Sequence, residues 1–177
     1  YTHAYLDDVV RHEIQKASRF GHRFSLIRME IGGLGELRRA GSETRFGQWL
    51  ERLVQQMGAA LRATDLLATR SESSYSVLLP ETDALGAAVL KQRVRETLET
   101  SGILRVPGAQ PRLTLASVTY PTDGTQLDVL ESVVEERLEE NRVSSLAPLV
   151  SGQHAFAKLV DTLLEGARPE PPEMANR

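Results

Sequence analysis

Apolar residues recur along this chain with two spacings, and each spacing predicts one kind of element. Spacing of three and four predicts amphipathic helices over residues 3–20, 46–61, 85–98 and 127–138. Short apolar and β-branched runs predict strands over residues 24–31, 66–70, 75–79, 112–120 and 142–146. This order predicts an α+β fold, in which helices pack on a mixed central sheet of about five strands.

The last part of the chain has a different character. An apolar stripe from Phe156 to Leu164 predicts an extra C-terminal helix. The stretch after it is rich in proline and glutamate, a composition typical of a disordered end. We therefore expect one domain over residues 1–146, followed by a C-terminal helix and tail over residues 147–177.

Composition narrows the possible functions. A chain of 177 residues, 41% of them hydrophobic, is long enough for one domain with a real core. The net charge of -3 leaves no basic surplus, so we expect no nucleic-acid partner. The absence of cysteine excludes disulfides and cysteine-based metal sites or catalysis. The four histidines are scattered, and their spacing suits no metal site.

The sequence also indicates a location. No apolar run is long enough to span a bilayer, so we expect no direct membrane insertion by this segment. The first residue is Tyr1 rather than Met. We therefore expect a cytoplasmic segment of a longer protein, and that protein can itself be membrane-associated.

Two short motifs stand at a fixed offset. Arg62-Ala63-Thr64-Asp65 precedes the polar turn Ser71-Glu72-Ser73-Ser74-Tyr75 by five residues. With the strand over residues 24–31 and the order of elements, this spacing resembles the GGDEF domain of diguanylate cyclases from about residue 3 to residue 146. The first motif then falls on the family's RxxD, and the turn falls on the GGDEF signature itself. The resemblance implies a nucleotidyl-cyclase-like fold.

The resemblance also implies that the metal site is lost. Joining two GTP molecules needs divalent metal held by carboxylates. Glu30 takes the place of the family's first acid, but Gly32 and Ser73 take the places of the other two. A neutral hydroxyl is a poor ligand for a hard cation. We expect no bound metal, no cofactor and no catalytic residue.

The substrate contacts of the family are replaced as well. Ser71 and Glu72 stand where two glycines let GTP approach the backbone, and Glu72 adds bulk and negative charge there. Arg38 and Gly47 stand where the family reads guanine with Asn and Asp. Asn141 stands near the position of a phosphate-binding Lys. We therefore expect no diguanylate cyclase activity.

What remains is the part of the family that binds its product. The resemblance assigns cyclic di-GMP, commonly as an intercalated dimer, to Arg62, Asp65 and an arginine of the following helix, which falls on Arg93. A guanidinium fits guanine O6 and N7, and a carboxylate accepts from the N–H groups of guanine. We expect a receptor module whose bound ligand changes contact with a neighbouring domain or partner protein.

Other interpretations remain open on the sequence. Arg62 and Asp65 can form an i,i+3 surface ion pair, Arg93 can be a solvated helix charge, and all three can be neutral remnants of a cyclase. The alternative function is a nucleotide-independent interaction or dimerisation domain, in which the stripe from Phe156 to Leu164 pairs with a partner or a second copy. A third is residual GTP binding through Glu30.

Overall fold

The computed structural model describes residues 1–144. Tyr1–Asn141 forms one compact unit. The predicted domain boundary at residue 146 and the predicted helix from Phe156 to Leu164 lie outside the described residues. None of the helices described is long and apolar enough to cross a membrane.

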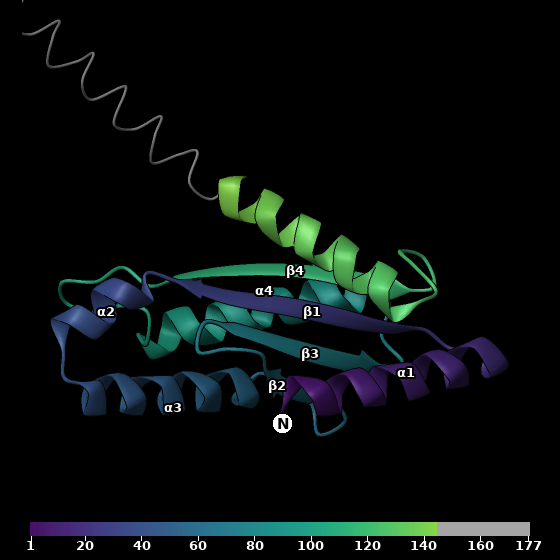
Figure 1. Ribbon diagram of the computed structural model, residues 1–177, viewed down its shortest axis with the longest axis horizontal. Helices are drawn as coiled ribbons and strands as arrows, with labels where there is room; N and C mark the ends of the chain where they lie inside the picture. The colour runs from purple at the N-terminus through teal and green to yellow at the C-terminus, as the bar shows by residue number, and fades with distance from the viewer. Residues whose placement is uncertain (145–177) are drawn as a thin grey trace, which may run out of the picture. The chain divides into compact units, whose positions relative to one another are not determined.

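A four-stranded antiparallel sheet forms the centre of this unit, in the order β2-β3-β1-β4 (Figure 1). The strands are β1 (Phe24–Gly32), β2 (Leu66–Thr69), β3 (Ser74–Pro80) and β4 (Arg112–Tyr120). β1 lies between β3 and β4 and is buried along most of its length. Because it is covered on both faces, β1 supplies apolar side chains to both: Ile27, Met29 and Ile31 to one core cluster, and Phe24 and Leu26 to the other.

Helices cover both faces of the sheet. On one face lie α3 (Glu43–Ala59) and α4 (Ala84–Ser101), which bury Leu53, Met57 and Leu98 against β1 and β3. On the other face lie α1 (His3–Phe20) and the helix that starts at residue 127, which bury Leu6 and Leu130. Figure 1 shows α1 and the green helix in front of the sheet and α4 behind it. The α+β prediction is confirmed.

Three predictions about the sheet are wrong. The sheet is antiparallel throughout rather than mixed, and the described residues form four strands rather than about five. Residues 142–144 are helical, not part of a strand. The apolar spacing of Leu127, Leu130, Val134 and Leu138 sets up a helix that continues past Asn141.

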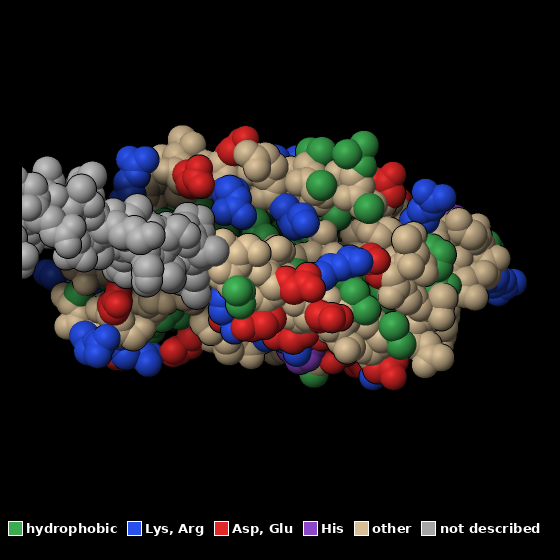
Figure 2. Space-filling view, turned by 90° about the horizontal axis from the view of Figure 1, so that it is seen from above, with side chains coloured by type: hydrophobic (Ala, Val, Ile, Leu, Met, Phe, Trp, Pro, Cys, Tyr) green, Lys and Arg blue, Asp and Glu red, His purple; other side chains and the backbone are tan. Residues whose placement is uncertain are grey.

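The open edge of β4 is closed by side chains instead of a fifth strand. They come from the turn and helix that follow β4, and they bond backbone groups of that edge: Asp123 to the Thr119 N–H (2.7 Å), Arg137 to the Ser117 carbonyl (2.8 Å) and Asn141 to the Leu115 carbonyl (2.8 Å). Unpaired edge groups invite pairing with another chain, and capped ones do not. Seen from the β4 side, Figure 2 shows charged side chains of both signs gathered on this surface.

The sequence did not predict α2 (Leu34–Ala40), because the glycines before it read as a turn. Gly33 precedes this helix with a φ of +81°, and a Cβ at this position would lie 2.7 Å from the Gln110 carbonyl oxygen. Only glycine meets both conditions without strain.

We expect Gly33→Ala to lower the free energy of unfolding by about 2 kcal/mol, because the added Cβ is strained and meets backbone. Urea unfolding followed by circular dichroism measures this. Gly35→Ala is the matched control, because a Cβ at Gly35 meets nothing within 4 Å and the residue is helical. Equal stability of the two variants would contradict the role given to Gly33.

Candidate functional site

Residues Arg62 to Asp65 form a hydrogen-bonded turn between α3 and β2. The Arg62 N–H donates to Asp65 Oδ2 at 2.8 Å, and the Asp65 N–H donates to the Arg62 carbonyl at 3.1 Å. The Asp65 carboxylate therefore fixes the backbone of this turn. It makes no ion pair with the Arg62 guanidinium, which has no ionic partner among residues 1–144. The i,i+3 ion pair, one of the alternatives above, is not formed.

Arg93 meets this turn from α4. Arg62, Asp65 and Arg93 line one hollow. The rest of its lining comes from β3, α4 and the loop between them: Leu79, Thr82, Gly86, Val89 and Leu90. The structure thus brings the three predicted residues together. Arg93 Nε is buried and has no hydrogen-bond acceptor among the described residues. Buried donors without partners are rare, so this atom differs from an ordinary solvated charge.

A larger hollow borders Arg62 on its other side. Its walls are the end of α1, the start of β1 and the loop after β3: Gly21, His22, Arg23, Glu81, Thr82, Asp83 and Gly86. This hollow has a volume of about 470 Å³, against about 10 Å³ for the hollow with Arg93. The sequence did not predict this larger hollow, because the residues that line it lie far apart in the chain.

The polar turn Ser71-Glu72-Ser73-Ser74-Tyr75 lies elsewhere, at the connection of β2 and β3. Both carboxylate oxygens of Glu72 accept from Arg38 Nη2 at 3.0 Å, and Arg38 also lies 4.5 Å from the centre of the Phe46 ring. Arg38 lies on α2 and Gly47 on α3. Arg38 and Glu72 therefore pair with each other. Because both are about half exposed, the pair contributes at most about 1 kcal/mol.

The rest of this turn is held by its own hydroxyls. Ser71 Oγ and Ser73 Oγ lie 3.2 Å apart, and the Tyr75 hydroxyl donates to the Glu72 carbonyl at 2.9 Å. Burial, and secondarily the charge of Glu72, raise the pKa of Tyr75. Ser74 starts β3 opposite Glu30 of β1.

Potential metal-binding side chains do not form large clusters in the part of the chain that the structure describes. Among residues 1–144, no group of three or more His, Cys, Asp or Glu side chains could hold a metal ion. Asn141, near the family's phosphate-binding position, donates its amide to the Leu115 carbonyl. Its side chain thus bonds the sheet edge.

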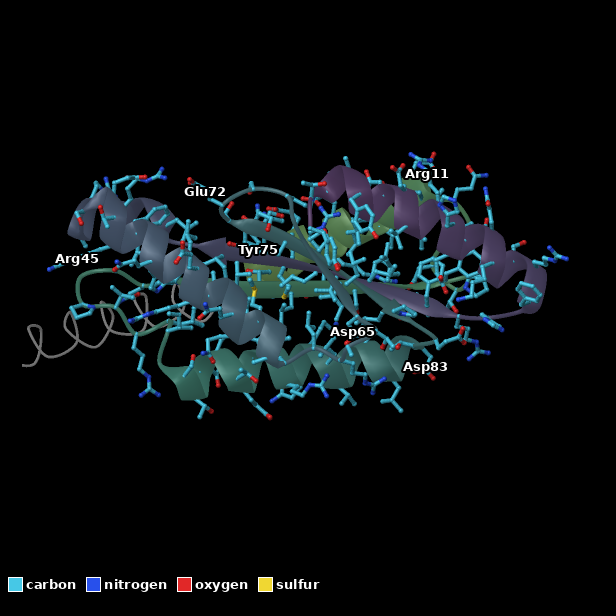
Figure 3. All side chains as sticks on the ribbon, turned by 90° about the horizontal axis from the view of Figure 1, so that it is seen from below. Arg11, Arg45, Asp65, Glu72, Tyr75 and Asp83 are labelled. Atoms are coloured by element: carbon cyan, nitrogen blue, oxygen red, sulfur yellow. The ribbon has the colours of Figure 1, made fainter. Side chains whose placement is uncertain are left out.

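The two regions are spatially separate. Figure 3 shows Glu72 at the tip of the β2–β3 hairpin, whereas Asp65 lies beside α4 and Asp83 lies at the start of that helix. A small ligand at Arg62 would not contact the turn Ser71-Glu72-Ser73-Ser74-Tyr75. The arrangement around Arg62 presents guanidinium donors and a carboxylate beside an apolar helix face, a combination that suits a purine with a phosphate.

Structural comparison places the fold among GGDEF domains. The GGDEF domain of TpbB (YfiN) from Pseudomonas aeruginosa gives a TM-score of 0.71 at 14% identity, over 81% of this chain and 84% of its own. The GGDEF domain of DgcB from Caulobacter crescentus, solved in complex with c-di-GMP, gives 0.66 at 12% identity, over 78% and 83%. The diguanylate cyclase SiaD from P. aeruginosa, solved with its activator SiaC, gives 0.70 at 19% identity, over 81% and 55%.

No protein-family model and no curated protein matches the sequence. The structural likeness nevertheless confirms the fold that the motifs predicted: the chain has the fold of a GGDEF domain. At these identities the likeness concerns the fold alone. What the chain binds has to be argued from its own residues.

Proposed function

We propose that this chain is a catalytically inactive GGDEF-type domain that binds cyclic di-GMP at Arg62, Asp65 and Arg93 and acts as a receptor module. The observation that carries the proposal is that three residues from two separate segments line one hollow with unpaired guanidinium groups. Arginine side chains without ionic partners are available to a ligand. A ligand acceptor at Arg93 would also satisfy its buried Nε.

Each side chain has a defined role in this proposal. Arg62 donates to guanine O6 and N7 in a bidentate manner, and the carboxylate oxygen of Asp65 not fixed by the Arg62 N–H accepts from the guanine N–H edge. Arg93 donates to a second acceptor of the same ligand. Val89 and Leu90 provide an apolar surface for the base. The DgcB domain, which was solved with this ligand, has the same fold.

The proposal includes the loss of cyclase chemistry. We expect no cyclic di-GMP to form from GTP with Mg²⁺ or Mn²⁺. By the resemblance, Ser73 and Gly32 stand in place of two metal-binding acids, and Glu72, which bonds Arg38, stands where GTP would approach the backbone. Chromatography of nucleotides after prolonged incubation measures this. Steady product formation in proportion to protein concentration, by protein free of contaminating cyclase, would contradict it.

Titration calorimetry of the wild-type chain with cyclic di-GMP tests the binding function directly. We expect saturable binding with a micromolar or lower Kd, the affinity range of a specific small-ligand site. Bound ligand would then sit beside Val89 of α4, which is 57% exposed and lies one helical turn from the 73% exposed Leu85, and present a combined surface to a neighbouring domain or partner.

A second candidate function rests on the same apolar residues. Leu85 and Val89 lie one helical turn apart and remain exposed, so they can contact another protein without any nucleotide. SiaD, with the same fold, was solved with a protein activator. If the folded wild-type chain fails to bind cyclic di-GMP, the nucleotide-independent interaction domain becomes the better explanation.

A further inference from the structure

The hollow at Arg93 is too small to hold the nucleotide that the proposed function assigns to it. Its volume is about 10 Å³. Pockets that bury small ligands typically have volumes of about 300–1,000 Å³. The adjoining hollow, at about 470 Å³, falls within that range, and it shares Arg62, Thr82 and Gly86 with the first.

We propose that the ligand lies mainly in this larger hollow and that Arg23 is a further binding residue, which contacts a phosphate of the cyclic dinucleotide. This inference rests on the proposed function and extends its site across Arg62 to the end of α1. Arg62 then stands in the middle of the site rather than at its edge, with Arg93 on one side and Arg23 on the other.

The larger hollow is lined by two arginines and two acids, and only the acids have partners within it. Arg23 is exposed and has no ionic partner among residues 1–144. The two acids of the hollow are already engaged: the Glu81 carboxylate lies 2.7 Å from His22 Nδ1, and Asp83 accepts from the Gly86 N–H at 2.9 Å. The guanidinium groups of Arg23 and Arg62 therefore stay available to a phosphate.

The backbone of the hollow is also unusual. Glu81 has a φ of +49°, the one positive value outside glycine among the described residues. A non-glycine residue in this conformation is uncommon and strained. This conformation holds the Glu81 carboxylate beside His22. Such local strain occurs often at ligand sites and turns, and here it shapes one wall of the hollow.

Calorimetric titration of Arg23→Ala with cyclic di-GMP tests the proposal. We expect about a tenfold weaker affinity and a weaker dependence on salt, because one charge-assisted phosphate contact is lost. Arg19→Ala is the matched control: Arg19 is an exposed arginine near the same end of α1, it lies outside both hollows, and its guanidinium contacts the Phe20 ring. Its affinity should stay within about twofold of wild type.

The imidazole resonances of His22 provide a second measurement that needs no substitution. They should shift when ligand is added, while those of His12 on α1, which bonds the Asp8 carbonyl, should not. Unchanged affinity in Arg23→Ala together with an unshifted His22 would overturn this inference. If Arg62→Ala still abolishes binding in that case, the proposed function stands. If the wild-type chain does not bind at all, both fail.

Discussion

Arg62→Ala is expected to lower the affinity for cyclic di-GMP by about 100-fold or more, which corresponds to roughly 3 kcal/mol. The substitution removes a bidentate, charge-assisted donor from Arg62, the one charged residue in the lining of both hollows. The fold should survive, because the Arg62 side chain is exposed and the turn is held by its backbone N–H and by Asp65. Titration calorimetry measures the affinity, and thermal unfolding checks the fold.

Arg45→Ala is the control for this experiment. Arg45 is an exposed arginine on α3, and Figure 3 shows it at the far end of the molecule from Asp65. The two substitutions remove the same charge, so a general electrostatic effect on an anionic ligand would lower both affinities alike. Equal affinities in wild type and Arg62→Ala would refute the site, and the search for a function would move to protein partners.

Asp123→Ala is expected to lower the free energy of unfolding by about 2–3 kcal/mol, or the midpoint temperature by roughly 5–10 °C. Asp123 accepts from Arg137 Nη2 at 2.6 Å and Nη1 at 3.0 Å, and also from the Thr119 N–H. Its side chain is only 15% exposed. Removing it leaves the Thr119 N–H at the edge of β4 and the Arg137 guanidinium without the carboxylate that both of them bond.

The contribution of Asp123 should depend on pH in a defined direction. Its hydrogen bond with Arg137 is the main cause that lowers the pKa of the Asp123 carboxyl below its ordinary value of 3.8, and the Thr119 N–H adds to it. A lowered folded-state pKa stabilises the fold above the ordinary value, and this stabilisation is lost as pH falls through the folded-state pKa. The stability gap between wild type and Asp123→Ala should therefore be constant from about pH 7 to 5 and narrow below about pH 4.

Urea unfolding at several pH values measures both effects. Asp8→Ala is a suitable control, because Asp8 is an exposed acid on α1. Asp123→Asn should fall between wild type and Asp123→Ala, since an amide oxygen can still accept from the Thr119 N–H but carries no charge. A gap that stays constant down to about pH 3 would show that the charge of Asp123 does not stabilise the fold.

Sequence periodicity predicted most of the fold. The bounds of α1 and β4 are those expected, and β1 and β3 differ by only a residue or so at their ends. In each of these elements the apolar residues keep a single spacing over many residues, so the sequence distinguishes clearly between helix and strand. The sequence did not predict α2, because this helix has only seven residues and follows glycines, which are typical of a turn.

The candidate site was predictable in part. Arg62 and Asp65 stand three residues apart, and the resemblance to a known motif placed Arg93 near them; the structure places all three around one hollow. No motif or spacing in the sequence pointed to the larger hollow. Gly21–Arg23 and Glu81–Asp83 are nearly sixty residues apart, and they meet only because β1 and β3 pair with Phe24 opposite Pro80.

The sequence by itself determined the order of the elements and which faces of them are buried. These are local properties, because each depends on residue type and spacing along the chain. Only the tertiary structure decided that Asp65 bonds the Arg62 backbone instead of its guanidinium, that Arg38 pairs with Glu72, and that side chains cap β4 in place of a fifth strand. Such contacts depend on strand register and helix packing, which join residues that no spacing rule connects.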